Sequence, residues 1–161
     1  MIKFEVNRMH IVLVEPEIPG NTGNIARLCA ATNCELHLVK PLGFSIEDKY
    51  LKRAGLDYWH LVKVHCHENF AEVVELYKGH NFYFNTTKAH KSYSDVQYLA
   101  DDLLVFGKET AGLPEDLLKA NQDHCVRIPM VDDARSLNLS NAAAIVVYEA
   151  LRQQQFVNLK Y

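Results

Sequence analysis

The residues best suited to chemistry lie at positions 136–141, directly before an apolar run at 142–147 that is typical of a helix. Polar side chains alternate with leucines there, and the polar members are Ser136, Asn138, Ser140 and Asn141. One side chain is enough to cap a helix, so four candidates exceed what the helix start requires. The surplus indicates a shell of ligand-binding groups, against the alternative that these side chains only cap the helix.

A second polar segment, residues 19–27, surrounds the expected start of an earlier helix. Its glycines and the asparagines Asn21 and Asn24 would leave free backbone N–H groups for an anion or a polar ligand. Arg27 shares a helix face with Asn24, and its planar guanidinium could hold a phosphate or a ribose oxygen. The alternative is that the asparagines cap the helix and Arg27 pairs with a surface carboxylate. The segment contains neither a dinucleotide-binding motif nor a P-loop.

A third segment, residues 106–114, follows an apolar strand. Gly107 would allow the backbone to approach a ligand closely, because glycine has no Cβ. Glu109 stands just past the strand end, where a carboxylate could meet a hydroxyl or a cation. The alternative is an ordinary joint between a strand and a helix.

The elements that must position these segments alternate between strand and helix. Short β-branched runs predict strands, and apolar residues at helical spacing predict helices. The expected strands are 10–14, 36–39, 61–64, 82–84, 103–106 and 125–128, and the expected helices are 22–32, with Asn21 or Thr22 as the cap, 70–77, 115–120 and 139–155. This alternation predicts an α/β protein with a mostly parallel sheet flanked by helices. All three polar segments follow strands, so we expect them at the carboxyl edge of that sheet.

The length of 161 residues fits one domain, which we expect to span 1–161. Four cysteines are scattered without CxxC spacing, the start has no long apolar signal segment, and no run of 18 apolar residues occurs. These features predict a cytoplasmic protein with free thiols and no membrane contact.

The net charge of −3 argues against general binding of polyanions. Local basic clusters are still possible sites for nucleic acid. The densest cluster is Lys49, Lys52 and Arg53, and a second one is Lys88, His90 and Lys91. The alternative for both clusters is ordinary solvated surface.

The motif His65-Cys66-His67 could suggest a metal, since a strand would place both histidines on one face. No second ligand pair has zinc-like spacing in the sequence, so we expect no metal. No Ser-His-Asp or Cys-His nucleophile pattern stands out either.

The three polar segments, in this order, resemble the three motifs of the SPOUT superfamily of RNA methyltransferases. Within it the chain is most similar to the TrmL/YibK family of tRNA (cytidine/uridine) 2′-O-methyltransferases. The resemblance runs from His10 to Phe156 and is carried by residues 15–19, 21–25, 27–30, 53–58, 86–88, 106–110, 112–114, 128–130 and 135–141, continuing to 148–150. Ala134 and Ala89 depart from the family pattern, which often has Ser and Gly at these positions.

The resemblance implies an α/β fold with a deep C-terminal trefoil knot, with the knotted cofactor-binding region at about 80–155, and a homodimer. It implies S-adenosylmethionine as the cofactor, with contacts at Asn85, Gly107, Ile128, Ser136 and Leu137. The implied catalytic set is Asn21, Arg27, Glu109, Ser136 and Asn138. With an RNA substrate, we expect Lys49, Lys52, Arg53 and Lys88 to contact phosphates.

The implied reaction moves a methyl group to the ribose 2′-hydroxyl of the wobble nucleotide of tRNA. Cytidine or carboxymethylaminomethyluridine would be the base, leucine tRNAs the substrates, and no metal or obligatory protein partner would be needed. The alternatives are another tRNA position, ribosomal RNA, or a non-catalytic module that binds adenosylmethionine or RNA. Arginine keeps its proton under ordinary conditions, so Arg27 is interpreted as an electrostatic aid before a general base.

Overall fold

A six-stranded sheet forms the centre of the protein in the computed structural model, which describes residues 7–55 and 58–160. Its order is β3-β2-β1-β5-β4-β6, and every strand pair is parallel. The bounds are β1 His10–Val14, β2 Glu35–Val39, β3 Val64–His67, β4 Phe82–Asn85, β5 Leu103–Phe106 and β6 Cys125–Val126. The prediction of a mostly parallel α/β sheet is therefore confirmed.

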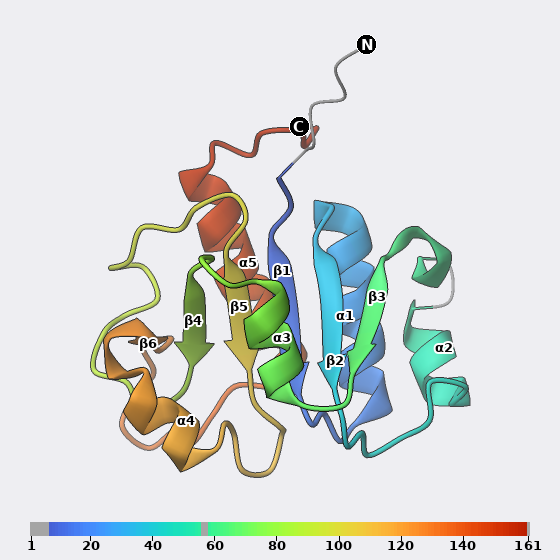
Figure 1. The fold of residues 1–161 in the computed structure, drawn as a ribbon, viewed down its shortest axis with the longest axis horizontal. Coiled ribbons are helices and arrows are strands. Elements are labelled where there is room, and N and C mark those ends of the chain that lie inside the picture. The colour runs from blue at the N-terminus through green and yellow to red at the C-terminus, as the bar shows by residue number, and fades with distance from the viewer. Residues whose placement is uncertain (1–6, 56–57, 161) are drawn as a thin grey trace.

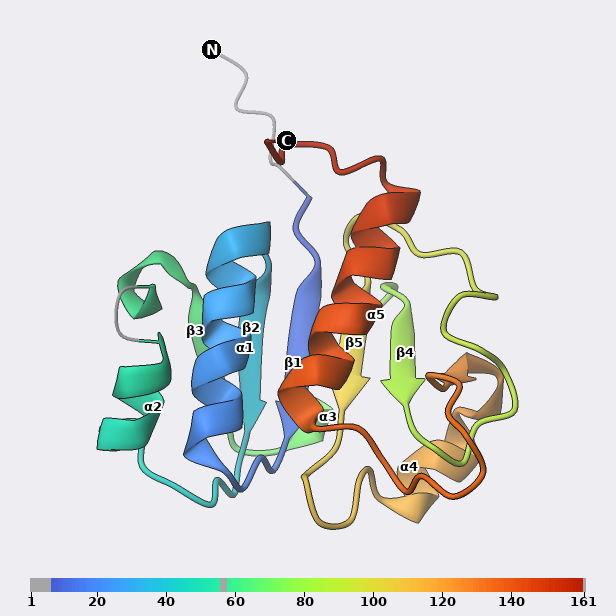
Figure 2. The same cartoon turned by 180° about the vertical axis from the view of Figure 1, so that it is seen from behind.

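Helices cover both faces of this sheet (Figure 1). The helices are α1 Pro19–Thr32, α2 Lys49–Gly55, α3 Phe70–Leu76, α4 Glu115–Ala120 and α5 Leu139–Gln153, with 3-10 turns at Trp59–Leu61 and Gln122–His124. Figure 2 shows α1 and α5 side by side on one face, with α2 beside α1. The opposite face carries α3 and α4. Among the described residues, no helix is long and apolar enough to cross a membrane.

The central strand β1 is buried along its whole length, as the apolar run at residues 11–14 predicts. Alternate side chains point to opposite faces. Ile11 and Leu13 join the core beneath α1 and α5, whereas Val12 and Val14 join the core beneath α3 and α4. Two separate cores therefore fix the sheet between its helices.

Several element boundaries differ from the expectation. The third strand was expected at 61–64 but lies at Val64–His67, because residues 59–61 form a 3-10 turn that leaves Leu61 exposed. Helix α1 begins at Pro19, where proline needs no N–H partner, so Asn21 and Thr22 lie inside the first turn and are not its cap. Helix α2 was not expected at all. The last strand and α5 are shorter than expected.

The strands all point toward one edge of the sheet, where the loops after β1, β5 and β6 emerge (Figure 1). Because the sheet is parallel, the three polar segments predicted to be functional meet at this edge. Leu56 and Asp57, which belong to the motif at 53–58, lie outside the described residues, as do residues 1–6 and 161.

Candidate functional site

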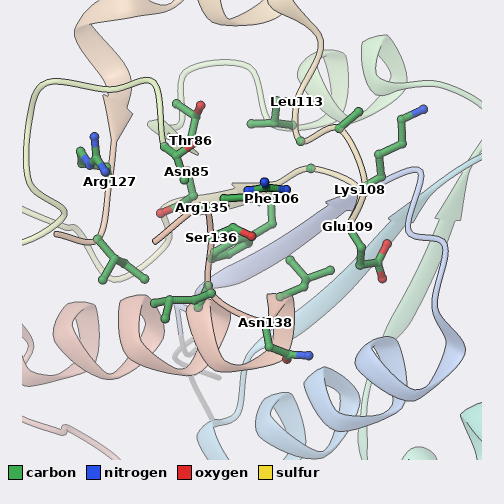
Figure 3. Close-up of a pocket in the computed structure, with 18 of the residues that line it drawn as sticks. Asn85, Thr86, Phe106, Lys108, Glu109, Leu113, Arg127, Arg135, Ser136 and Asn138 are labelled. Atoms are coloured by element: carbon green, nitrogen blue, oxygen red, sulfur yellow. The ribbon is translucent and has the colours of Figure 1, made fainter. Parts of the chain in front are cut away.

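A cavity of about 570 Å³ opens at the carboxyl edge of β4, β5 and β6. Figure 3 shows side chains from several segments around it, with Asn85 at the end of β4, Glu109 after β5 and Ser136 before α5. The predicted site residues that line the cavity are Asn21, Asn85, Lys88, Gly107, Glu109, Ile128, Ser136, Leu137 and Asn138. The segments singled out in the sequence therefore form one site.

Arg27 does not line this cavity, and neither do the basic residues of α2. The Arg27 side chain is exposed on α1, and its guanidinium carbon lies 4.8 Å from the centroid of the Tyr58 ring. This distance is typical of a cation–π contact. Within residues 7–55 and 58–160, no carboxylate forms an ion pair with Arg27, so the surface-pairing alternative gains no support there.

Glu109 holds the start of α1 from a distant loop. Its carboxylate accepts hydrogen bonds from the backbone N–H of Glu17 at 2.8 Å and of Ile18 at 3.1 Å. It also accepts one from the Asn21 side-chain amide at 3.3 Å. The N-cap residue Ile18 provides no side-chain cap, and Glu109 instead fixes the two residues that precede the helix. Its negative charge suits the positive end of the helix dipole.

Glu17 in turn binds the loop that carries Glu109. Its carboxylate accepts from the Thr110 backbone N–H at 3.0 Å and from the Thr110 hydroxyl at 2.8 Å. Two carboxylates and two backbone segments therefore clasp the loops after β1 and β5. The exposed side of this clasp faces the cavity, because Thr110 and Ile18 line it.

Asn138 joins the third loop to the same network. Its side-chain amide donates to the Asn21 Oδ1 at 3.1 Å, while its own Oδ1 accepts from the Ser140 backbone N–H at 2.9 Å. Asn138 is therefore the cap of α5 and also a link to α1. Through Glu109, Asn21 and Asn138, side-chain hydrogen bonds connect all three segments, which assigns these residues a positioning role.

Gly107 is required by the loop itself. A Cβ at this position would lie 2.1 Å from the carbonyl carbon of Gly112 and 2.3 Å from the backbone nitrogen of Leu113. The loop folds back on itself here, with Gly112 at φ +69° and its N–H donating to the Lys108 carbonyl at 2.8 Å. The close backbone approach expected at Gly107 is thus made by its own loop.

Replacing Gly107 with alanine should destabilise the protein by about 1–3 kcal/mol, the usual effect of overpacking, because backbone atoms must move to admit the methyl group. Urea unfolding measures the loss. Gly20→Ala is the matched control, since a Cβ there meets nothing within 4 Å. Equal stabilities of the two variants would contradict the packing interpretation.

The cavity wall combines apolar surface with a buried acceptor. Asn85 donates from its amide to the Val105 carbonyl at 3.1 Å, whereas its Oδ1 is buried without a partner among the described residues. Phe106, Leu113 and Ile128 add apolar lining. An unpaired buried oxygen at a cavity wall favours a ligand that donates a hydrogen bond there.

Basic side chains at the cavity were missed by sequence reasoning. Lys108, Arg127 and Arg135 line it (Figure 3), although Arg135 stands next to Ser136 in a segment already singled out. The signal that could have found Arg135 is its place in that polar segment. Lys88 was expected to contact RNA; it lines the cavity and pairs with Glu115 at 3.1 Å.

Comparisons with known proteins agree with the family resemblance found in the sequence. Residues 8–148 match the SpoU rRNA Methylase family. The chain is 56% identical over 155 residues, 94% of it and 97% of the relative, to a Bacillus subtilis protein provisionally named tRNA (cytidine(34)-2′-O)-methyltransferase. It is 52% identical over 147 residues, 91% of it and 96% of the relative, to the tRNA (cytidine(34)-2′-O)-methyltransferase of Methylovorus glucosotrophus.

Among solved structures, a chain studied for the 2-OH methylation of C/U34 on tRNA is similar in fold. It matches with a TM-score of 0.89 and 41% identity, covering 93% of this chain and 98% of that one. Every residue that lines the cavity falls within the matched range 8–148. The similarity therefore includes the whole candidate site.

Proposed function

Because this chain belongs to the SpoU rRNA methylase family, as its motifs predicted, we propose that it methylates the ribose 2′-hydroxyl of the wobble nucleotide of tRNA. The observation that carries the proposal is an identity above 50% to relatives named for this reaction, across a range that contains the entire cavity. Cytidine or carboxymethylaminomethyluridine is the proposed base, and leucine tRNAs are the proposed substrates.

The cavity fits S-adenosylmethionine as the methyl donor. Its volume lies within the range of roughly 300–1,000 Å³ that is typical of small-molecule sites. Its apolar wall suits the adenine ring, the free Oδ1 of Asn85 suits a donor group, and Arg135 suits the carboxylate. The residues proposed to hold the cofactor are Asn85, Gly107, Ile128, Ser136 and Leu137. When bound, S-adenosylmethionine supplies a methyl group attached to a sulfonium sulfur. The neutral thioether that remains after the transfer is a good leaving group.

With such a leaving group, positioning supplies much of the rate. Asn21, Glu109 and Asn138 fix the loops that form the cavity, and the Ser136 hydroxyl lines it. Arg27 stands outside the cavity and is free to hold the nucleotide and to stabilise the charge that develops on the ribose oxygen. The proposed methyl transfer itself requires no metal ion.

We propose that the chain is one domain with a C-terminal trefoil knot. The residue after β6 is held to the long loop between β4 and β5 by backbone pairing, since the Arg127 N–H donates to the Lys91 carbonyl at 2.9 Å and its carbonyl accepts from the Tyr93 N–H at 2.8 Å. The end of α5 contacts the same long loop, because the Gln153 amide donates to the Val96 carbonyl at 3.0 Å. These contacts support the proposed knot, because they hold the segment after β6 and the end of α5 against the same loop.

We also propose a homodimer that acts in the cytoplasm without an obligatory partner protein. Large apolar side chains are exposed on α5 and on the loop before it, at Leu137, Ile145 and Tyr148. Exposed apolar groups that gather on one element favour contact with another protein surface. A second copy seated there would cover them.

Methyl transfer to tRNA tests the proposed function. Purified protein is incubated with radiolabelled S-adenosylmethionine and tRNA from cells that lack the wobble modification, and the labelled nucleotide is mapped. Label at position 34 supports the proposal. Label at another tRNA position, or only in ribosomal RNA, would replace the substrate, and cofactor binding without any transfer would favour a non-catalytic module.

The basic residues of α2 make a separate prediction about RNA binding. Lys49, Lys52 and Arg53 are exposed, and Lys52 forms only an exposed ion pair with Glu47 at 2.7 Å. Reversing all three charges should lower the slope of log affinity against log salt by about 2–3, roughly 0.7–0.9 for each lost phosphate contact. Filter binding over a salt series measures this slope, and Lys78→Glu on the opposite face is the control. An unchanged slope would exclude α2 from the RNA surface, and Lys88 is tested separately because it also lines the cavity.

A further inference from the structure

Four histidines lie together on the sheet face covered by α3 (Figure 1), away from the methyl-transfer cavity. They come from three neighbouring strands, with His10 on β1, His37 on β2, and His65 and His67 on β3. Strand register explains the cluster, since His10 pairs with Glu35 and His37 pairs with His65. Parallel partners project to the same face, so three strands contribute donor groups to one place.

Two of these histidines, His10 and His37, form with Glu35 a triad that has the spacing of metal ligands. His10 Nδ1 lies 3.0 Å from His37 Nε2 and 3.7 Å from Glu35 Oε2, and all three donor atoms lie within 4.8 Å of one another. Ligands about 2.0–2.1 Å from a tetrahedral zinc ion are roughly 3.3–3.4 Å apart. The distances from His10 Nδ1 to the other two donor atoms are within a few tenths of an ångström of that spacing.

His65 holds the carboxylate of this triad from the solvent side. Its Nε2 lies 3.1 Å from Glu35 Oε2, and its ring stacks on that of His37 with centroids 4.7 Å apart. The His65 side chain is 39% exposed, whereas that of Glu35 is 13% exposed. His65 therefore positions Glu35 and lies between the triad and solvent.

The surroundings orient His37 for this role. Its Nδ1 lies 2.9 Å from His67 Nε2, and His67 Nδ1 lies 3.8 Å from Glu72 Oε2. A proton on the Nδ1 of His37 and of His67 would leave His37 Nε2 as an acceptor. This nitrogen lies 3.0 Å from His10 Nδ1 and 3.4 Å from the Tyr77 hydroxyl, and a metal ion would take the place of these hydrogen-bond donors. A second partner on the other ring nitrogen commonly fixes a histidine ligand in proteins.

The carboxylate of Glu35 lies beside the donor atoms of His10 and His37, and Lys63 approaches it only at 3.7 Å.

We propose that Glu35, His10 and His37 form a zinc-binding site that ties β1 and β2 together. The ligand set of two imidazoles and one carboxylate suits Zn²⁺. A water molecule would complete the four ligands of the ion. It is separate from the methyl-transfer cavity and does not depend on the proposed function.

Metal titration of the full chain tests this proposal. Protein without an affinity tag is freed of metal with a chelator and titrated with Co²⁺, whose visible bands report tetrahedral coordination, and then with Zn²⁺ in competition. We expect one ion per chain and a higher melting temperature with Zn²⁺. Glu35→Gln preserves the shape of the side chain but removes its charge, and it should weaken binding at least tenfold.

The controls separate this site from other donors. Cys66→Ser removes the exposed thiol on β3, and His124→Gln removes a histidine outside the cluster; both should bind Co²⁺ like the original chain. His10→Gln should lose Co²⁺ binding. If this variant fails to fold, the titration of Glu35→Gln tests the proposal on its own. No bound ion in the original chain, or equal binding by folded Glu35→Gln, would overturn the proposal and leave a hydrogen-bonded histidine network.

Discussion

Replacing Arg27 with alanine should lower the rate of methyl transfer to tRNA by at least about 100-fold, while S-adenosylmethionine binds almost as tightly as before. The expected size follows from the loss of one group that stabilises developing charge, which typically costs about 10²–10³ in rate. The separation of effects follows from geometry, because Arg27 is exposed on α1 and does not line the cavity.

Single-turnover kinetics and calorimetry measure the two effects independently. Arg27→Lys is the informative second variant, because it keeps the positive charge but loses the planar fork and the stacking on Tyr58. We expect it to recover only part of the rate. A folded Arg27→Ala variant that loses cofactor affinity would place Arg27 in cofactor binding and exclude the proposed role.

The strands that could be predicted from the sequence are those whose burial comes from apolar side chains. β1 and β5 are continuous apolar runs, and their positions are confirmed. β3 was placed too early because its inward side chains are His65 and His67, which a hydropathy pattern counts as polar. Their packing beneath α3 depends on tertiary contacts that the local sequence does not contain.

The candidate site was predictable to the extent that topology alone determines it. Parallel strands bring the loops that follow them to one edge, so three polar segments were expected together and do form one cavity. The partner of each side chain was not predictable. Glu109 bonds to residues about 90 positions earlier in the chain, and Arg27 does not line the cavity, whereas Asn21 on the same helix does. These relations depend on the angle at which α1 leaves β1.

Replacing Glu109 with alanine should destabilise the protein by about 2–3 kcal/mol and weaken cofactor binding about tenfold. The carboxylate is the acceptor for two backbone N–H groups and the Asn21 amide, and hydrogen bonds to a charged group typically contribute about 1.5–3 kcal/mol. Its loss leaves the two backbone N–H groups before α1 without this acceptor and releases Asn21 from one side of the network that shapes the cavity. Urea unfolding and calorimetry measure the two changes.

Glu115→Ala is the matched control for Glu109, because it removes a carboxylate from the next helix whose only ion pair within the described residues is an exposed one with Lys88. Exposed pairs contribute at most about 1 kcal/mol, so this variant should remain close to the original chain. Glu109→Gln should fall between them, since an amide oxygen can still accept from the backbone but lacks the charge that the helix dipole favours. If Glu109→Ala matched Glu115→Ala in both measurements, the clasp would not hold the loops, and Glu109 would have to act on a ligand directly.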